Sequence, residues 1–371
     1  MEKMVIDPQF WQGKRVFLTG HTGFKGAWLA LWLQHYGAQV YGYSLPPPTP
    51  RNLYQQAGIA AGLAGETIAD IRDHAALCAA LQQAQPEIVL HLAAQAIVLE
   101  SYRDPLETFS SNIMGTATLL QAIRSIDTVR AVVIVTSDKC YENREWVWGY
   151  RETDPMGGYD PYSASKGAAE LITASMRQSF FPPQDYARHG VAIATARAGN
   201  VIGGGDWAHH RLLPDLIRSL LAGESCVIRH PQAVRPWQHV LEPLSGYVML
   251  AQALWRDGPA YNGGWNFGPQ DDSARPVAWI ADRLVQLWPQ AQPWTRASQP
   301  GPHENLYLKL DISQARARLG WSPVWSLDTT LERLVDWYSA YAQGQDLAAI
   351  SRAQLVQFCQ DQAQQRTGDT A

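Results

Sequence analysis

The chain has 371 residues, of which 46% are hydrophobic and 17% are charged, and its formal net charge is −4. This composition is typical of a folded globular protein with one large domain or two smaller ones that share a core. Long runs of Lys and Arg are absent, so we expect neither nucleic acid nor an anionic membrane as a partner.

Two further features bear on cellular location and on metal binding. No apolar run approaches the roughly 18 residues that a membrane helix requires, and the first residues lack the pattern of a signal peptide. The four cysteines are far apart in the sequence and form no C-x-x-C pair, which predicts neither a zinc site nor a disulfide scaffold. We therefore expect a cytoplasmic protein with reduced thiols and no bound metal.

Apolar runs alternate with helical patterns through residues 1–200. A run at 16–18 is followed by a glycine-rich turn, a helical pattern at 27–36 and a second run at 39–43. Further runs, separated by helical patterns, lie at 88–92, 131–136 and 191–196. Because parallel strands need crossover helices, this alternation predicts an α/β fold with a doubly wound, parallel, Rossmann-type sheet.

After residue 200 the sequence becomes rich in Gly, Pro, Trp and Arg, with a helical pattern at 212–222. We expect a smaller C-terminal substrate-binding region made from about 201–236 and 266–307. Residues 1–200, with returning segments at about 237–265 and 308–343, should form the NAD-binding Rossmann domain. The Ala- and Gln-rich residues 344–371 are predicted to form a helical tail.

A G-x-x-G-x-x-G pattern follows the first apolar run and opens the first helical pattern. The glycines allow a tight turn and a close approach to a pyrophosphate, which the free N–H groups of a helix N-terminus then bind. An ordinary turn is the alternative, but the position inside a βαβ unit favours dinucleotide binding. The predicted cofactor-binding residues of this loop are Gly20, Thr22, Gly23, Phe24, Lys25 and Gly26.

The choice between NAD and NADP is open from these residues alone. An acidic residue usually ends the second strand of an NAD site, yet Ser44 stands there. Arg51 could meet the 2′-phosphate of NADP, or it could be an ordinary surface arginine. Asp70 and Ile71 follow the third strand region, where an acid and a backbone group could bind adenine, although a solvated turn would also explain the aspartate.

Tyr162 and Lys166 are four residues apart, which places them on the same face of a helix. The ammonium group of Lys166 should stabilise the phenolate of Tyr162 and lower its pKa from about 10 toward neutrality. Tyr162 would then accept the proton of an alcohol as hydride leaves. The spacing alone is common, and only its combination with the glycine loop makes it diagnostic.

Ser137, Asp138 and Lys139 follow the apolar run at 131–136. Functional groups gather at the carboxyl ends of strands in doubly wound sheets, so three polar residues at this point predict an active site. Ser137 could hydrogen-bond the reacting oxygen, Asp138 could act as an acid, and Lys139 could act as a base. A solvated turn is the alternative.

With these residues identified, the chain resembles the extended short-chain dehydrogenase/reductase superfamily over nearly its whole length. The glycine loop, His-Leu-Ala-Ala at 91–94, Asn112 and the segment 162–166 occur in the expected order. Within the superfamily the sequence is most similar to the nucleotide-sugar 4,6-dehydratases, in particular to their CDP-glucose branch. This similarity rests on the segments 136–141, 197–201, 235–240 and 319–323.

The resemblance implies a bound NAD and a small-molecule substrate, CDP-glucose, which would be oxidised at C4, dehydrated across C5 and C6, and reduced at C6. It implies that Leu92, Ala93 and Ala94 contact the cofactor, with Tyr162 and Lys166. It also implies a homodimer or homotetramer formed through helices near 106–124 and 162–178. The substrate-binding residues that it suggests are Asn200, Arg211, Arg235, His303 and Tyr307.

One departure within the family concerns the predicted acid and base. The dTDP-glucose relatives carry Thr-Asp-Glu where this chain has Ser137, Asp138 and Lys139, and the substitution matches the CDP-glucose branch. A lysine must be neutral to abstract a proton, so the protonation state of Lys139 is a question that the sequence leaves open.

Three alternatives compete with the dehydratase. A nucleotide-sugar 4-epimerase would need Ser137, Tyr162 and Lys166 but no acid and base for elimination, and the Asp138–Lys139 pair argues against it. The same objection applies to a decarboxylase or a simple reductase. A dinucleotide-binding regulatory protein would use the fold without catalysis, although such proteins usually lose the Tyr–Lys pair.

Overall fold

The computed structural model describes residues 4–298 and 307–368. Its centre is a seven-stranded sheet with the order β11-β6-β5-β4-β1-β2-β3, in which all neighbouring strands are parallel. The prediction of a doubly wound parallel sheet is confirmed. The strands of this sheet are β1 (Arg15–Thr19), β2 (Gln39–Ser44), β3 (Gly65–Ile68), β4 (Ile88–His91), β5 (Ala131–Val135), β6 (Ala192–Arg197) and β11 (Gly263–Asn266).

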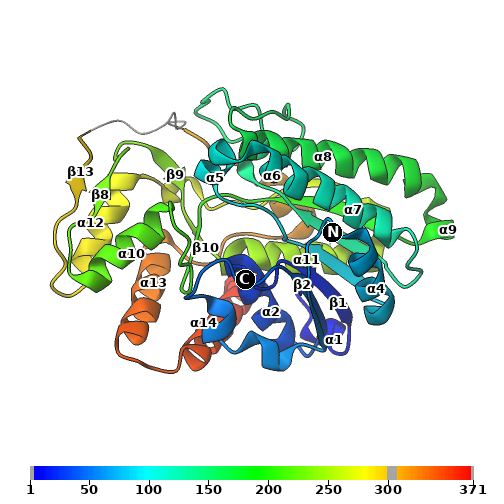
Figure 1. Ribbon diagram of the computed structural model, residues 1–371, viewed down its shortest axis with the longest axis horizontal. Coiled ribbons are helices and arrows are strands. Elements are labelled where there is room, and N and C mark those ends of the chain that lie inside the picture. The colour runs from blue at the N-terminus through cyan, green and yellow to red at the C-terminus, as the bar shows by residue number, and fades with distance from the viewer. Residues whose placement is uncertain (1–3, 299–306, 369–371) are drawn as a thin grey trace.

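Helices cover both faces of the sheet and extend beyond it (Figure 1). They are α1 (Pro8–Trp11), α2 (Phe24–His35), α3 (Leu53–Gln56), α4 (His74–Ala84), α5 (Val98–Arg103), α6 (Pro105–Phe109), α7 (Gly115–Ile123), α8 (Pro161–Phe180), α9 (Tyr186–His189), α10 (Leu212–Ala222), α11 (Leu241–Asp257), α12 (Val277–Leu287), α13 (Leu327–Ala342) and α14 (Leu347–Gly368). Short 3-10 turns are η1 (Ile59–Gly62), η3 (Asp138–Cys140), η4 (Pro183–Asp185), η5 (Gly258–Tyr261) and η6 (Asp271–Ser273), and single π turns are η2 (Ser110–Met114) and η7 (Ala315–Leu319).

The two faces of the sheet have separate cores because side chains alternate along each strand. Val16 and Leu18 of β1 belong to a core shared with α2 and α11, whereas Phe17 belongs to a second core with α4 and α7. The central strands β4 and β5 are buried along their whole length, as expected for parallel strands covered on both sides. This double burial explains why these strands are continuous apolar runs in the sequence.

Five of the seven strands coincide with the predicted apolar runs, and the helix predicted at 212–222 has those bounds. The edge strands β3 and β11 had no predicted bounds, because Gly65–Ile68 is half exposed and Gly263–Asn266 begins with two glycines. The helix predicted at 27–36 is α2, and it begins earlier, at Phe24, directly after the second glycine of the loop. That earlier start brings the N-terminus of α2 to the end of β1.

Three two-stranded ladders extend the molecule at one end, where α10 and α12 also lie (Figure 1). They pair β10 (Gln238–His239) with β7 (Val201–Ile202), β12 (Ala274–Pro276) with β9 (Val234–Pro236), and β13 (Thr295–Arg296) with β8 (Val227–Ile228). The chain returns from this end through α11, which packs on β4, β5 and β6. The domain limits given above stay a prediction. Among the described helices, none is long and apolar enough to cross a membrane.

Candidate active site

A cleft of about 1070 Å³ runs along the carboxyl ends of the parallel strands. The strand order reverses between β1 and β4, which is the position where doubly wound sheets bind ligands. One half of the cleft is lined by the turns after β1, β2, β4 and β5, and the other half by segments 198–215 and 226–237. Its volume exceeds that of a typical pocket for one small molecule, so the cleft has room for a dinucleotide and a second ligand.

The glycine loop forms the floor of the first half of the cleft, and all six of its predicted residues line it. Gly20 has a φ of 77°, in the left-handed region that favours glycine. A side chain at Gly26 would overlap the carbonyl oxygen of Gly20, so only glycine allows α2 to pack this closely on the turn. The N-terminus of α2 has no side-chain cap at Gly23, and its free N–H groups are available to a phosphate.

Lys25 adds an ammonium group to this loop, and its surroundings disfavour the charged form of that group. Its ammonium group donates to the hydroxyl of Tyr247 on α11 at 3.2 Å. Burial, together with the nearby cations Arg211 and Lys166, lowers the pKa of Lys25 to about 7. Sequence reasoning missed Tyr247, because nothing in its local pattern distinguishes it from a core residue of an apolar helix.

The adenosine end of the cleft is lined by hydroxyl groups and has no Lys or Arg among its lining residues 43–71. The hydroxyl of Ser44 lies 2.8 Å from that of Thr22, which also donates to the carbonyl oxygen of Leu45 at 2.8 Å. Arg51 is exposed and is not one of the described cleft-lining residues, and its guanidinium lies over the rings of Trp207 and Tyr341. Without a cation for a 2′-phosphate, this end favours NAD over NADP.

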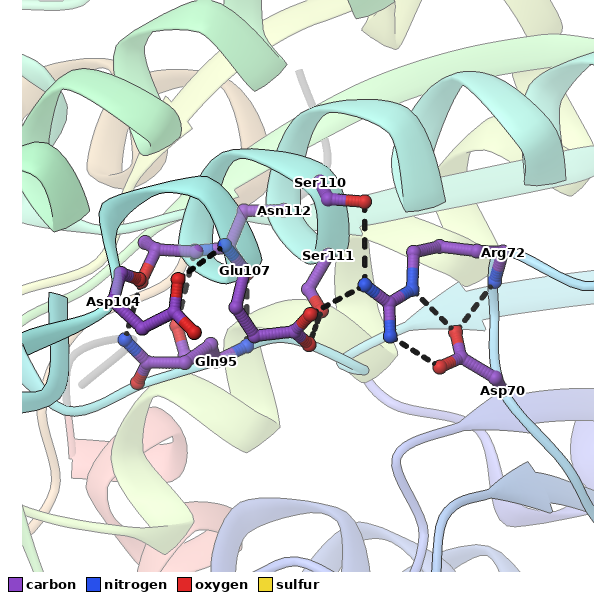
Figure 2. A network of polar contacts seen from close by, with 9 residues as sticks. Asp70, Arg72, Gln95, Asp104, Glu107, Ser110, Ser111 and Asn112 are labelled. Atoms are coloured by element: carbon purple, nitrogen blue, oxygen red, sulfur yellow. Dashed lines mark hydrogen bonds and ion pairs between the residues drawn. The ribbon is translucent and has the colours of Figure 1, made fainter.

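Asp70 and Ile71 also line the cleft, at the end of β3. Figure 2 shows that the carboxylate of Asp70 faces the guanidinium of Arg72, which donates from Nε at 2.9 Å and from Nη2 at 2.5 Å. Hydrogen bonds from Arg72 hold the pKa of Asp70 below its usual range. The same guanidinium contacts Glu107 at 2.6 Å, so the predicted adenine-binding turn is tied to α6.

The π turn η2 contributes Ser110, Ser111 and Asn112 beside this network (Figure 2), and Asn112 connects the turn to α8. Its Asn112 is 2% exposed and accepts a hydrogen bond from the backbone N–H of Gln95 at 2.8 Å. The amide group of Asn112 donates to the hydroxyl of Ser165 on α8 at 2.8 Å and to the carbonyl oxygen of Gln95 at 3.0 Å. Asn112 thereby fixes the loop after β4, which carries the cleft-lining residues Leu92, Ala93 and Ala94.

Tyr162 and Lys166 occupy successive turns of α8, and both are buried at the cleft. The Lys166 ammonium lies 6.0 Å from the centre of the Tyr162 ring, and burial lowers its pKa to about 8. The expected lowering of the Tyr162 pKa is not found. Burial raises that pKa to about 12, and a hydrogen bond with Ser137 and the charge of Arg211 only partly offset the effect.

Ser137, Asp138 and Lys139 follow β5 after one intervening residue, Thr136, and line the cleft beside Tyr162. The hydroxyl of Ser137 donates to Oδ1 of Asp138 at 3.0 Å. Asp138 is 2% exposed, and its Oδ2 has no hydrogen-bond partner among the described residues. A side chain at Gly199 would overlap this carboxylate, so glycine is needed there for Asp138 to sit beneath the cleft.

The second half of the cleft carries cations and a residue with a left-handed backbone. Asn200 has a φ of 46°, which asparagine adopts more often than most other non-glycine residues. Arg235 on β9 is 6% exposed, while the side chain of Arg211, before α10, is 35% exposed and contacts Asp206 at 3.4 Å. Sequence reasoning did not single out several other residues that line this half, among them Arg229, His230 and Trp237.

The other two predicted substrate-binding residues are not placed in the cleft. Tyr307 is not one of the described cleft-lining residues, and its carbonyl oxygen accepts a hydrogen bond from Asn143 at 3.0 Å. His303 lies outside the described residues. Within 4–298 and 307–368, no group of three or more His, Cys, Asp or Glu residues could hold a metal ion.

Comparisons with known proteins identify relatives of this arrangement. Residues 16–264 match the model of the NAD dependent epimerase/dehydratase family. The CDP-glucose 4,6-dehydratase of Salmonella typhimurium is 51% identical over 354 residues, which are 95% of this chain and 98% of that protein. The dTDP-glucose 4,6-dehydratase of Xanthomonas campestris pv. campestris is 30% identical over 285 residues, or 72% of this chain and 77% of that protein.

Two solved structures share the fold at lower identity. A UDP-glucose-4-epimerase from Stenotrophomonas maltophila with bound NAD superimposes with a TM-score of 0.76 at 23% identity, covering 89% of this chain and 99% of that one. The UDP-glucose 4-epimerase of Thermus thermophilus in complex with NAD gives a TM-score of 0.74 at 22% identity, covering 88% and 99%. At these identities the likeness shows the fold alone.

Proposed function

Since this chain belongs to the NAD dependent epimerase/dehydratase family, we propose that it converts CDP-glucose to CDP-4-keto-6-deoxyglucose with loss of water. It is an enzyme of the short-chain dehydrogenase/reductase superfamily, and NAD is its cofactor. The observation that carries the proposal is the pair Asp138–Lys139, which adds an acid and a base to the Tyr162–Lys166 pair in one cleft.

The first step assigns roles to Tyr162, Lys166 and Ser137. When bound, NAD would supply the hydride acceptor for C4 of the sugar and the hydride donor for C6. Tyr162 accepts the proton of the C4 hydroxyl, and Ser137, which hydrogen-bonds Tyr162, binds the same oxygen. Lys166 is buried beside the tyrosine ring, and its ammonium form stabilises the phenolate.

The second step removes water. The C4 ketone acidifies the C5 proton, which Lys139 removes in its neutral form while a protonated Asp138 gives its proton to the departing C6 hydroxyl. The product of this step is a 4-keto-5,6-ene and one water molecule. Asp138 is placed for this role at the cleft beside Tyr162, where it is almost fully buried and its Oδ2 accepts no hydrogen bond from any described residue.

The third step restores the enzyme. Hydride returns to C6, and Lys139 gives its proton back to C5. Tyr162 still holds the proton from C4, and Asp138 lacks the proton that it gave to water. Ser137 hydrogen-bonds both side chains, so the proton can pass from Tyr162 through Ser137 to Asp138 without leaving the cleft. The net change is the loss of one water molecule.

For the diphosphate of the substrate we propose Arg235 and Arg211 as ligands, with Asn200 as a hydrogen-bonding partner. A guanidinium forms forked hydrogen bonds to phosphate oxygens, and Arg235 is positioned on β9 with little exposure. The preference for CDP-glucose over other nucleotide-sugars rests on the similarity to the Salmonella typhimurium protein. His303 and Tyr307 stay predictions for the same site.

An epimerase is the second candidate, because the solved structures of similar fold include UDP-glucose 4-epimerases. An epimerase oxidises C4 and reduces it again from the other side, so it needs no acid and base at C5 and C6. The buried acid Asp138, held by Ser137 and fitted against Gly199, has no task in that reaction. This observation favours the dehydratase.

Mass spectrometry distinguishes the two reactions. The purified protein is incubated with NAD and, in parallel, with CDP-, dTDP-, GDP- and UDP-glucose. We expect CDP-glucose alone to lose one water molecule, with the alkaline absorbance of a 4-keto sugar, and the double variant Asp138→Asn, Lys139→Met to abolish that loss. An isomeric product of unchanged mass would identify an epimerase, and no turnover of any substrate would indicate a binding protein.

We also propose a homodimer formed through α6, η2, α7 and α8, which correspond to the segments near 106–124 and 162–178 that the sequence suggested. These elements pack against one another and expose Leu106 (77%), Met114 (55%) and Leu171 (62%). Exposed apolar side chains on adjacent helices are typical of an interface. Leu106→Glu together with Leu171→Glu should give a monomer in sedimentation equilibrium, whereas an unchanged mass would contradict this interface.

Finally, we place the enzyme in the cytoplasm. Its four cysteines, Cys78, Cys140, Cys226 and Cys359, are all free thiols, which suits a reducing compartment. Cell fractionation with an antibody tests this location, and recovery in an exported fraction would contradict it.

A further inference from the structure

A buried ion pair lies one helical turn beyond the catalytic lysine. Glu170 follows Tyr162 and Lys166 at spacings of eight and four residues on α8, and its side chain is 6% exposed. Arg197, the last residue of β6, is 5% exposed and binds the carboxylate with both arms of its guanidinium. The distances are 2.9 Å from Nε to Oε1 and 2.8 Å from Nη2 to Oε2.

Two threonine hydroxyls complete the hydrogen bonding of this carboxylate. Thr136 donates to Oε1 of Glu170 at 2.5 Å, and Thr195 donates to Oε2 at 2.6 Å. Each oxygen therefore accepts two hydrogen bonds, which is the capacity of an ionised carboxylate. Burial alone would raise the pKa of Glu170, but Arg197 and the two hydroxyls hold it below its usual range. The pair is ionised and has little freedom to move.

The partners of this pair flank the segment that carries the proposed acid and base. Thr136 directly precedes Ser137, so Glu170 holds the beginning of segment 137–140. Tyr141 directly follows that segment, and its hydroxyl accepts a hydrogen bond from Arg197 at 2.6 Å. The Glu170–Arg197 pair, whose residues lie on α8 and β6, thus contacts the residues at both ends of segment 137–140.

The guanidinium of Arg197 packs closely against β11. A side chain at Gly264 on β11 would overlap Nη2 of Arg197, so this glycine makes room for the group. The hydroxyl of Tyr141 donates to Asn266 at 2.8 Å, on the same strand. The C-terminal end of segment 137–140 is therefore attached to the edge strand β11, and its N-terminal end is attached to α8.

We propose that Glu170 and Arg197 are positioning residues that set the geometry of Asp138 and Lys139 relative to Tyr162 and Lys166. This inference rests on the proposed dehydratase reaction, in which elimination needs all four groups around one sugar. Tyr162 and Lys166 are placed by α8 itself, whereas Asp138 and Lys139 lie on the 3-10 turn η3. This turn packs against α8, and its Cys140 carbonyl accepts a hydrogen bond from the N–H of Gly157 at 2.8 Å. Loss of either contact to this turn should slow elimination more than C4 oxidation.

Thr136 and Thr195 allow a matched test, because both are buried and both donate to Glu170. Only Thr136 is attached to segment 137–140, so Thr136→Val releases the turn and Thr195→Val does not. Tyr141→Phe releases the other end by removing the hydroxyl that Arg197 binds. All three changes keep the shape of the side chain and leave the ion pair in place, which avoids the severe destabilisation expected when one partner of a buried pair is removed.

Single-turnover reactions with CDP-glucose and bound NAD separate the two steps. The near-ultraviolet absorbance of reduced nicotinamide follows C4 oxidation, and rapid-quench mass spectrometry follows the loss of water. In Thr136→Val and in Tyr141→Phe we expect elimination to slow by roughly 10- to 100-fold relative to oxidation, so that reduced nicotinamide accumulates. Thr195→Val should slow both steps equally or leave both unchanged.

Hydrogen exchange of the substrate-free enzyme gives a readout that does not depend on activity. The amide of Cys140 bonds to the carbonyl oxygen of Ser137, and we expect its exchange to accelerate in Thr136→Val and in Tyr141→Phe but not in Thr195→Val. Identical behaviour of the two threonine variants in exchange and in rate would overturn the inference. A wild-type enzyme that released no water from CDP-glucose would instead refute the proposed function, whatever the exchange data showed.

Discussion

Replacing Glu242 with glutamine should flatten the pH dependence of the stability of this protein. Glu242 lies in the first turn of α11 and is 1% exposed. Its carboxyl group accepts hydrogen bonds from the backbone N–H groups of Val324 at 2.9 Å and Trp325 at 2.7 Å. Burial raises the pKa of Glu242 from 4.5 to about 8, and the two hydrogen bonds offset only part of that effect.

The direction of the effect follows from this raised pKa. In the folded protein the carboxyl group stays protonated up to about pH 8, whereas in the unfolded chain it ionises near pH 4.5. Stability from this group is therefore complete below pH 4.5 and is lost as the pH rises toward 8. The loss is about 1.4 kcal/mol for each pH unit, so between pH 5 and pH 7 it approaches about 2.5 kcal/mol.

Urea unfolding of the wild type and of Glu242→Gln at a series of pH values measures this effect. The variant loses one acceptor for the two backbone N–H groups, so at pH 5 it should be less stable by about 1–3 kcal/mol. Because glutamine does not titrate, the difference in the free energy of unfolding should narrow or reverse by pH 8. Parallel stability curves over this range would show that burial does not control the ionisation of Glu242.

Three further predictions concern the cleft. Gly26→Ala should destabilise the fold by about 1–3 kcal/mol and weaken NAD binding, because the added side chain would overlap the carbonyl oxygen of Gly20. Gly23→Ala is the control, because its side chain would lie 3.4 Å from that oxygen and should leave thermal stability nearly unchanged. Ser44→Arg should raise affinity for NADP at least several-fold in titration calorimetry, because cleft-lining residues 43–71 include no Lys or Arg; equal affinities in the variant and the wild type would contradict this reading. Asp138→Asn should keep C4 oxidation but slow water loss by about 100-fold or more, and a normal rate of dehydration would remove Asp138 from its proposed role.

Local patterns in the sequence were sufficient for the sheet and for the cofactor loop. The central strands are buried on both faces, so each had to be a continuous apolar run, and the glycines after β1 satisfy requirements that act within a few residues. The edge strands β3 and β11 escaped prediction because their burial is partial and their glycines weaken the strand pattern. The resemblance to the short-chain dehydrogenase/reductase superfamily is confirmed by the match of residues 16–264.

The sequence also placed most of the candidate site, because its residues lie at strand ends or at helical spacing. It did not foresee the ionisation state of Tyr162, whose pKa depends on how deeply α8 is buried at the cleft. It left the role of Arg51 open, and only the structure showed that its guanidinium lies over Trp207 and Tyr341 and that Arg51 is not one of the described cleft-lining residues. The sequence could not predict the role of Tyr247, because its contact with Lys25 joins residues that are 222 positions apart.

The sequence by itself therefore determined the doubly wound sheet, the dinucleotide loop and the residue types at the catalytic strand ends, since each depends on local periodicity or on backbone requirements of a few residues. The tertiary structure alone decided which charges meet. Glu170 and Arg197 are 27 positions apart and reach segment 137–140 from a helix and a neighbouring strand, a relation that only the packing of α8 on the sheet creates. Burial, and with it every shifted pKa in the cleft, likewise depends on segments brought together from the whole chain, because the dielectric surroundings of a side chain are a property of the folded molecule.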